Sequence, residues 1–173
     1  KVRRVMQSRG NAGIPLTTNT PFGYKKDPKD KNRWLVDEPA AEVVQRIFQM
    51  CVSGLGPTQI AKRLKANGVM TPSEYLHSVG VKCPANPPAF PHNWCSATVA
   101  DILDRQEYTG DTVNFRSFRQ SFKLKKRLDK PQEEWKIFPD THPAIIDRET
   151  FVLVQNLRQH RRRPTRTGIV SMF

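Results

Sequence analysis

The stretch GPTQIAKRLKAN, residues 56–67, decides the fold, because its apolar residues recur at the spacing of one helix face. Ile60, Ala61 and Leu64 share that face, so we expect them to pack in a core. Pro57 suits the first helical turn, where its missing N–H is not needed. The basic residues of the stretch fall outside the apolar face: Lys62, Arg63 and Lys65.

A second stretch, WCSATVADIL at residues 94–103, predicts another helix, with Ser96 as its N-cap and Cys95, Val99, Ile102 and Leu103 on its apolar face. The opposite face carries short or forked side chains, which suit close approach to base edges in a DNA groove. Carboxylates are repelled by phosphates, but a carboxylate on this face can accept a hydrogen bond from a cytosine amino group. The candidate base-reading residues are Ser96, Ala97, Thr98, Asp101 and Arg105.

Residues 34–53 contain the clearest helix of the chain, since Asp37, Glu38 and Pro39 supply an acidic first turn that begins with proline. Its predicted buried stripe is Val43, Val44, Ile47, Phe48 and Cys51. These three helices predict a small helical core that resembles a helix-turn-helix protein. Between the last two of them, residues 73–93 have no clear period, and we expect at most a short helix near residues 72–77.

After Gly110 the pattern changes to β-favouring residues. Residues 112–118 and 135–138 are strand candidates that pair as a hairpin or wing, with residues 119–134 as its long tip. A last helix begins after Asp147, a good N-cap, and runs through Phe151, Val154 and Leu157. The predicted fold class is therefore α+β, mainly α, with a helix-turn-helix or winged-helix-like core and a small antiparallel hairpin or sheet.

Charge points to the partner. Lys and Arg outnumber Asp and Glu by 29 to 16, for a net charge of +13. A polyanion is the natural partner of such a chain, and nucleic acid is the first candidate. No apolar run approaches the roughly 20 residues of a membrane-spanning helix, and no signal-peptide pattern opens the chain. We therefore expect a soluble cytoplasmic protein with no membrane partner.

The three cysteines, an odd number at irregular spacing, predict free thiols in a reducing compartment. The alternative is a zinc site made by Cys83, His92 and Cys95, with His77 as a fourth ligand. Structural zinc sites use paired C-x-x-C spacing, and this chain has none. We expect no metal and no cofactor in this chain.

Basic residues cluster in the first nine positions, in the predicted wing and at the end of the last helix. The linker at residues 10–20, which is rich in Gly, Pro and Thr, is of a kind that can lie in a minor groove. A solvated loop in the wing and a helix dipole matched by a basic last turn are the alternatives. The candidate phosphate and groove contacts are Arg3, Arg4, Arg9, Lys62, Arg63, Arg116, Arg119, Lys123, Lys125, Lys126, Arg127, Arg161, Arg162 and Arg163.

Five motifs follow one another along the chain: PFGY at 21–24, EPAAEVVQRIF at 38–48, GPTQIAKRLKANGVMTP at 56–72, WCSATVADILDRQEYTG at 94–110 and HPAIIDRETFVLVQNL at 142–157. In this order they resemble the recombinase domain of large serine recombinases, in the resolvase and invertase superfamily. GDTVNF at 110–115, EEW and IF within 133–138, and RRRPT at 161–165 resemble the transposon-borne members most. The region between Met70 and Trp94 is longer than in many relatives.

The resemblance implies that residues 1–24 are the end of an inter-domain helix and a linker that tracks DNA, 25–160 the DNA-binding domain, and 161–173 a basic linker. It implies a bacterial parent enzyme whose serine domain cleaves DNA through a phosphoserine, without need of Mg²⁺, and whose downstream ribbon holds zinc. Other protomers would meet through those domains, so this stretch by itself is expected to be monomeric. The 94–103 helix would enter the major groove of one arm of a recombination attachment site.

By itself this stretch is expected to bind duplex DNA and to catalyse nothing. None of its serines has an evident adjacent base, and HPAIID is typical of a structural corner whose Ile145 and Ile146 enter the core. A free-standing winged-helix transcriptional regulator and a basic RNA-binding protein are the alternatives. The large aromatic residues are expected to be core anchors: Trp34, Trp94, Trp135, Phe48 and Phe151.

Overall fold

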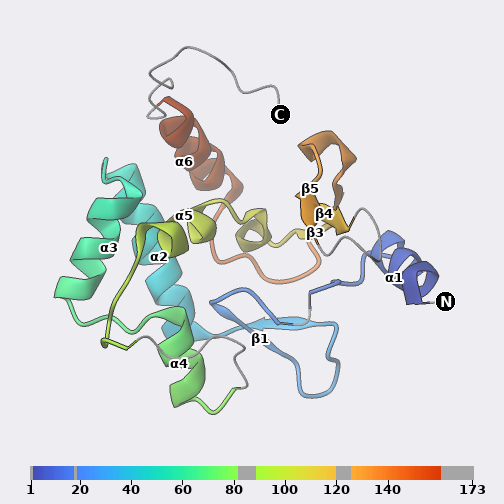
Figure 1. Cartoon of the computed structure of the whole chain (residues 1–173), viewed down its shortest axis with the longest axis horizontal. Helices are drawn as coiled ribbons and strands as arrows, with labels where there is room; N and C mark the ends of the chain where they lie inside the picture. The colour runs from blue at the N-terminus through green and yellow to red at the C-terminus, as the bar shows by residue number, and fades with distance from the viewer. Residues whose placement is uncertain (1, 18, 82–88, 120–125, 161–173) are drawn as a thin grey trace.

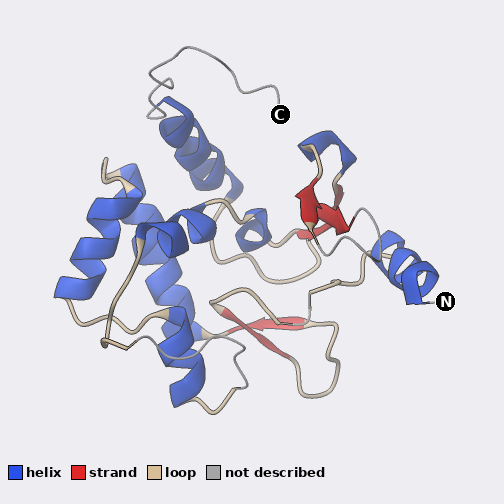
Figure 2. Cartoon of the chain, viewed as in Figure 1, coloured by secondary structure: helices blue, strands red, loops and turns tan. Residues whose placement is uncertain are grey.

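The fold is mainly helical, with small antiparallel sheets attached to a helical core, as predicted (Figures 1 and 2). The computed structural model describes residues 2–17, 19–81, 89–119 and 126–160. Within them the helices are α1 (Val2–Asn11), α2 (Glu38–Val52), α3 (Pro57–Ala66), α4 (Pro72–Ser78), α5 (Ser96–Leu103) and α6 (Arg148–His160). The strands are β1 (Tyr24–Lys26), β2 (Trp34–Val36), β3 (Thr112–Asn114), β4 (Ser117–Arg119), β5 (Arg127–Asp129) and β6 (Lys136–Phe138). No helix in these ranges is both long enough and apolar enough to cross a membrane.

Helix α2 lies at the centre of the core, where it contacts α3, α5 and α6. Its predicted stripe is confirmed, because Val44, Ile47, Phe48 and Cys51 are fully buried and Val43 is half-buried. The apolar face of α3 is buried as predicted, and α3 packs directly on α5. The short helix expected near residues 72–77 is α4.

The N-terminus of α6 is also as predicted. The carboxylate of Asp147 accepts the backbone N–H of Thr150 at 2.7 Å, as an N-cap does. Val154 of α6 is fully buried against the core, and Ile145 and Ile146 of the preceding corner are buried as expected.

A hairpin between β1 and β2 was not expected from the sequence, which placed Trp34 in the segment of the α2 helix. The two strands pair with Tyr24 opposite Val36 and Lys26 opposite Trp34. Tyr24 and Trp34 are buried, so each three-residue strand carries an aromatic anchor. Gly23 precedes β1 with φ +99°, and a Cβ there would lie 3.0 Å from Ile145. This hairpin therefore enters the core at a position that requires glycine.

The wing is longer than predicted. β3 pairs with β6, and beyond them β4 pairs with β5, with Arg119 opposite Arg127. Within the expected tip at 119–134, Arg127–Asp129 are therefore strand and Gln132–Glu134 form a 3-10 helix, while 120–125 lie outside the described residues. Trp135 is half-buried outside the core cluster, with the Arg116 guanidinium 5.0 Å from its ring centroid. The prediction of Trp135 as a core anchor is wrong, because it packs within the wing.

Helix α1 continues through Gly10, where the sequence predicted a break. The backbone of Gly10 is buried, and a Cβ on it would lie 2.3 Å from the ring of Phe115. This glycine permits close approach of the wing instead of ending the helix. The irregular linker begins at Ala12.

Candidate nucleic-acid interface

Helix α5 presents a polar face to solvent, as expected for a reading helix. Ser96, Ala97 and Asp101 are exposed and Thr98 is half-buried, whereas Val99, Ile102 and Leu103 face the core. Arg105 is not on the helix, because α5 ends at Leu103; Arg105 is half-buried and precedes a 3-10 helix at Gln106–Thr109. The exposed part of the candidate surface is therefore the outer face of α5, at Ser96, Ala97 and Asp101.

Cys95, and not Ser96, is the N-cap of α5. Its Sγ accepts the backbone N–H of Thr98 at 3.4 Å and lies 3.0 Å from the Thr98 hydroxyl. These hydrogen bonds, the one to the Thr98 side chain first, lower the pKa of the Cys95 thiol. The predicted place of Cys95 on the apolar face is wrong, because the thiol is exposed and caps the helix.

The C-terminal end of α5 is held by α6. The side-chain amide of Gln155 donates to the Leu103 carbonyl at 2.7 Å. Arg158 pairs with Asp104 through two hydrogen bonds, Nη1 to Oδ1 at 2.5 Å and Nη2 to Oδ2 at 2.9 Å. Arg158 looks from the sequence like a phosphate contact, but it neutralises the carboxylate that follows the reading helix. These contacts fix the orientation of α5 on the core.

Replacing Arg158 by Ala is expected to lower the free energy of unfolding by about 1 kcal/mol, near the upper end for a partly exposed pair, because the geometry is bidentate. Denaturant unfolding of the two single variants and of Arg158→Ala/Asp104→Ala measures the coupling. Arg158→Lys is the control, since it keeps the positive charge but loses the planar guanidinium that donates to both carboxylate oxygens. Additive losses in the double variant would show that the pair contributes nothing.

A cleft of about 750 Å³ lies between α5, the linker and the wing. Among its lining residues are Arg105, Arg116 and Arg127, together with four acids: Asp101, Asp104, Glu107 and Asp129. Arg116 is tied to Glu107 at 2.7 Å, and burial lowers the pKa of its guanidinium. The cleft thus offers hydrogen-bond donors and acceptors without an excess of positive charge. Such a mixture suits base edges better than phosphates.

The candidate phosphate contacts are divided over several surfaces. Arg4 and Arg9 are exposed on α1, Lys62 and Arg63 on α3, and Lys126 and Arg127 at the start of the outer wing ladder. The prediction of Arg116 as a phosphate contact conflicts with its ion pair to Glu107 and its place over Trp135. The side chains of Arg3 and Arg119 are not described, and Lys123, Lys125, Arg161, Arg162 and Arg163 lie outside the described residues.

The linker is fastened to the wing by one buried side chain. The Asn114 amide donates to the carbonyls of Gly10 and Ile14, both at 3.1 Å, and its oxygen accepts the N–H of Leu16 at 3.3 Å. Asn114 is only 3% exposed. Sequence reasoning did not single it out, because its partners lie about a hundred positions away.

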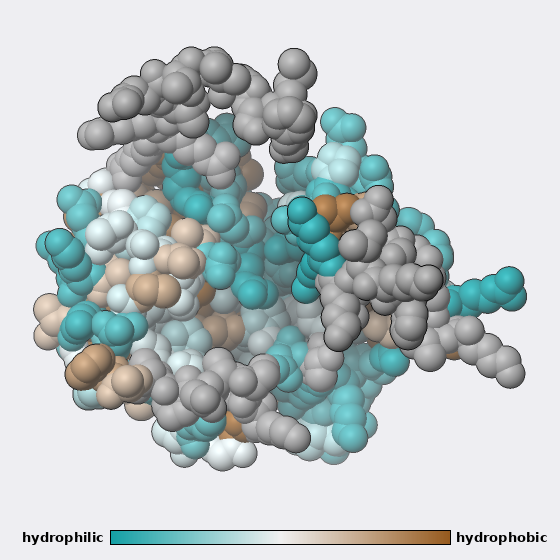
Figure 3. Space-filling view, viewed as in Figure 1, coloured by the Kyte–Doolittle hydropathy of each residue, from teal (hydrophilic) through white to brown (hydrophobic). Residues whose placement is uncertain are grey.

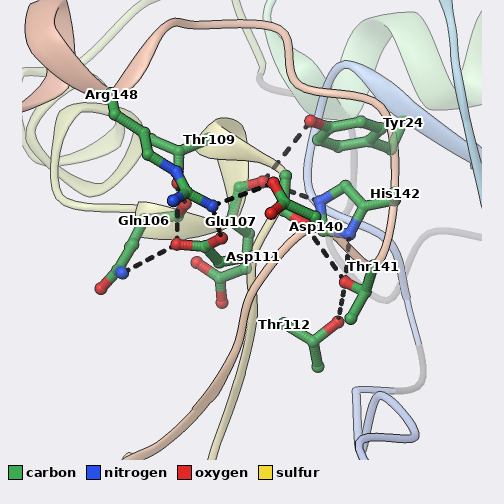
Figure 4. A network of polar contacts seen from close by, with 11 residues as sticks. Tyr24, Gln106, Glu107, Thr109, Asp111, Thr112, Asp140, Thr141, His142 and Arg148 are labelled. Carbon is green, nitrogen blue, oxygen red and sulfur yellow. Dashed lines mark hydrogen bonds and ion pairs between the residues drawn. The ribbon is translucent and has the colours of Figure 1, made fainter.

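A polar network joins the HPAIID corner to the core (Figure 4). Arg148 pairs with Asp111 at 3.0 Å and with Asp140 at 2.9 Å. His142 Nε2 lies 2.7 Å from the Glu107 carbonyl, which can only accept, so this nitrogen carries the hydrogen. The Tyr24 hydroxyl donates to the Pro143 carbonyl at 2.8 Å. These contacts hold the corner in place beside the core, in which Ile145 and Ile146 are buried.

Stability is expected to fall as the pH drops below about 6.5. Burial is the main cause that lowers the pKa of His142 in the folded chain, so the folded form stays neutral where the unfolded form takes up a proton. Above the ordinary histidine pKa both forms are neutral, and the contribution is fully retained. Denaturant unfolding between pH 7.5 and 5 measures the decline, and His142→Gln should reduce it. An equal decline in that variant would assign it to other groups.

Within the described ranges, no three His, Cys, Asp or Glu side chains come together as metal ligands. His92 and Cys95 are placed without such a cluster, and Cys83 lies outside the described residues.

Comparison with known proteins now identifies the class. The Recombinase family model matches residues 38–161. One similar solved structure, "Crystal Structure of a LSR-DNA Complex", has a TM-score of 0.57 at 19% identity over 98% of this chain and 43% of that one. Another, "Sequence Requirements of the Listeria innocua prophage attP site", has a TM-score of 0.47 at 20% identity over 98% of this chain and 56% of that one. No curated protein matches.

The helical core with its wing has the fold of the recombinase domain of large serine recombinases, which the order of the five motifs also indicates. The chain belongs to the Recombinase family. It spans less than half the length of the first of these solved chains.

Proposed function

We propose that this chain binds duplex DNA at one half of a recombination attachment site, as the DNA-binding part of a site-specific serine recombinase that excises or integrates a mobile element. The observation that carries the proposal is α5, whose outer face is exposed at Ser96, Ala97 and Asp101 and borders, at Asp101, a cleft of mixed hydrogen-bonding groups. Family membership and the net charge of +13 support it.

Cleavage through a phosphoserine belongs, in this proposal, to another domain of the parent protein, as does a zinc ribbon. The boundaries at 24 and 160 stay predictions, as do the monomeric state of this part alone and a place in the bacterial cytoplasm. Other protomers would be met through those further domains.

Selection of bound sequences from a randomised duplex pool at about 0.15 M salt tests this function, because phosphate-only binding is weak there. A consensus of one to two helical turns is the expected result. Binding without a consensus that vanishes as salt rises would contradict a sequence-reading role. Preference for RNA over duplex DNA would favour the RNA-binding alternative.

On the recovered site, Thr98→Ala is expected to cost about 1–3 kcal/mol of discrimination against random DNA if Thr98 contacts a base. Lys126→Ala is the matched control, since loss of a phosphate contact weakens binding to all sequences alike. Competition binding with both duplexes measures each effect. Equal losses on both duplexes for Arg105→Ala would remove Arg105 from the reading surface.

A further inference from the structure

A second groove lies between α1, the linker and the loop of the β1–β2 hairpin. It measures about 230 Å³, and three basic side chains line it: Arg9, Lys26 and Lys31. No carboxylate is among the described residues that line it. In Figure 3 the coloured atoms on the side of the molecule that carries α1 are mostly hydrophilic. Of the two clefts that border the linker at Leu16 and Thr17, this one has the unbalanced positive charge.

The carboxylates of the hairpin are used inside its own loop. Asp27 accepts the backbone N–H of Lys29 at 2.8 Å, and Asp30 accepts that of Asn32 at 2.9 Å. Against these two acids stand five basic residues, and Lys25 among them pairs with Asp37 at 3.8 Å. The five are Lys25, Lys26, Lys29, Lys31 and Arg33. The loop therefore keeps a net positive charge that its own turns do not cancel.

The groove is also partly preorganised. Arg9 Nη2 donates to the side-chain oxygen of Asn32 at 3.1 Å, so α1 and the hairpin loop are joined across it. Its floor includes Trp34, which is buried. A guanidinium held in place loses less conformational freedom when it binds an anion.

The linker forms a ridge between two unlike clefts. Leu16 and Thr17 line both the basic groove and the α5 cleft, and Asn114 fastens this ridge to the wing. A chain that follows a minor groove has one phosphate strand on either side of it. The α5 side offers balanced charge, whereas the hairpin side offers three cations.

We infer that the groove of Arg9, Lys26 and Lys31 binds backbone phosphates of one DNA strand, the strand that borders the minor groove on the hairpin side of the linker. This inference rests on the proposed function, with the linker lying in the minor groove as the sequence predicts, and adds to it a contact surface, the β1–β2 hairpin. Lys26 and Lys31 are the residues that it newly assigns to DNA.

The test is the salt dependence of binding to a random-sequence duplex, measured for the whole chain, Lys31→Ala and Lys26→Ala/Lys31→Ala. Each lost phosphate contact should make the slope of log K against log salt shallower by about 0.9 and weaken binding about fivefold near 0.15 M salt. Arg46→Ala is the control, since Arg46 is exposed on α2 and lines neither cleft, and its slope should equal that of the unchanged chain. Thermal unfolding checks that the variants, which are altered at exposed positions, remain folded.

An unchanged slope in the double variant, while the unchanged chain binds duplex, overturns the groove assignment and leaves the proposed function standing. Failure of the unchanged chain to bind duplex at all removes the proposed function first. On a site recovered by selection, ethylation of particular phosphates on one strand should block binding of the unchanged chain. The same ethylations should reduce binding of the double variant less. If ethylation at every phosphate interferes with the double variant as much as with the unchanged chain, the assignment is also overturned.

Discussion

Trp94→Ala is expected to lower the free energy of unfolding by about 3–5 kcal/mol, the range for removing a large buried aromatic side chain. Trp94 is 5% exposed and belongs to the core cluster immediately before the cap of α5. Its indole N–H donates to the Val69 carbonyl at 2.9 Å, which ties the start of α5 to the segment after α3. Urea denaturation followed by circular dichroism measures the loss. Because a domain of this size has only about 5–15 kcal/mol in total, the variant is expected to be marginal.

Two further variants separate the loss of core packing from the loss of the hydrogen bond to Val69. Trp94→Phe keeps most of the ring but leaves the Val69 carbonyl without its donor, at a cost of about 1–3 kcal/mol. Trp135→Ala is the matched control, because Trp135 is half-buried in the wing and outside the core cluster. A loss for Trp94→Ala no larger than that for Trp135→Ala would contradict the assignment of Trp94 as the anchor of α5.

The helices were predictable because their signal is local. The period of apolar residues and the Pro or Asp at each start placed α2, α3 and α6 within a few residues of their observed bounds. The choice between Cys95 and Ser96 as N-cap was not decided by pattern, since both neighbours have a side chain that can accept the hydrogen bond. Boundaries of this kind shift by one or two residues.

The pairings between distant residues were not predictable in the same way. β1 and β2 are three residues each, too short for an alternation to show, and Trp34 therefore fell into the helical segment. Arg116 and Arg158 looked like phosphate contacts, but Glu107 and Asp104 neutralise them. The run KKDPKDKNR at residues 25–33 was a readable signal of a basic loop. That this basic loop lies beside α1 can be known only from the fold.

Asn114→Ala is expected to free the linker while leaving the helical core intact. The side chain makes three hydrogen bonds to backbone groups of Gly10, Ile14 and Leu16, and loss of a bond of this kind costs about 0.5–1.5 kcal/mol. The linker should therefore lose about 2–4 kcal/mol of local stability, and exchange of the Leu16 amide hydrogen should accelerate by about 30- to 1,000-fold. Hydrogen exchange resolved by residue measures this, with amides of α2 as the internal reference.

Asn114→Asp sharpens the test, because it keeps the size of the side chain and the acceptor for Leu16 but removes both donors. A carboxylate would then face the carbonyls of Gly10 and Ile14 without a hydrogen between them, so this variant should release the linker at least as far as Asn114→Ala. If the ridge between the two clefts aligns them on DNA, Asn114→Ala also weakens duplex binding, although it changes no charge. Protection of the Leu16 amide equal to that of the unchanged chain would mean that contacts other than those of Asn114 hold the linker, among them the bond from the Ile14 N–H to the Arg9 carbonyl at 3.1 Å.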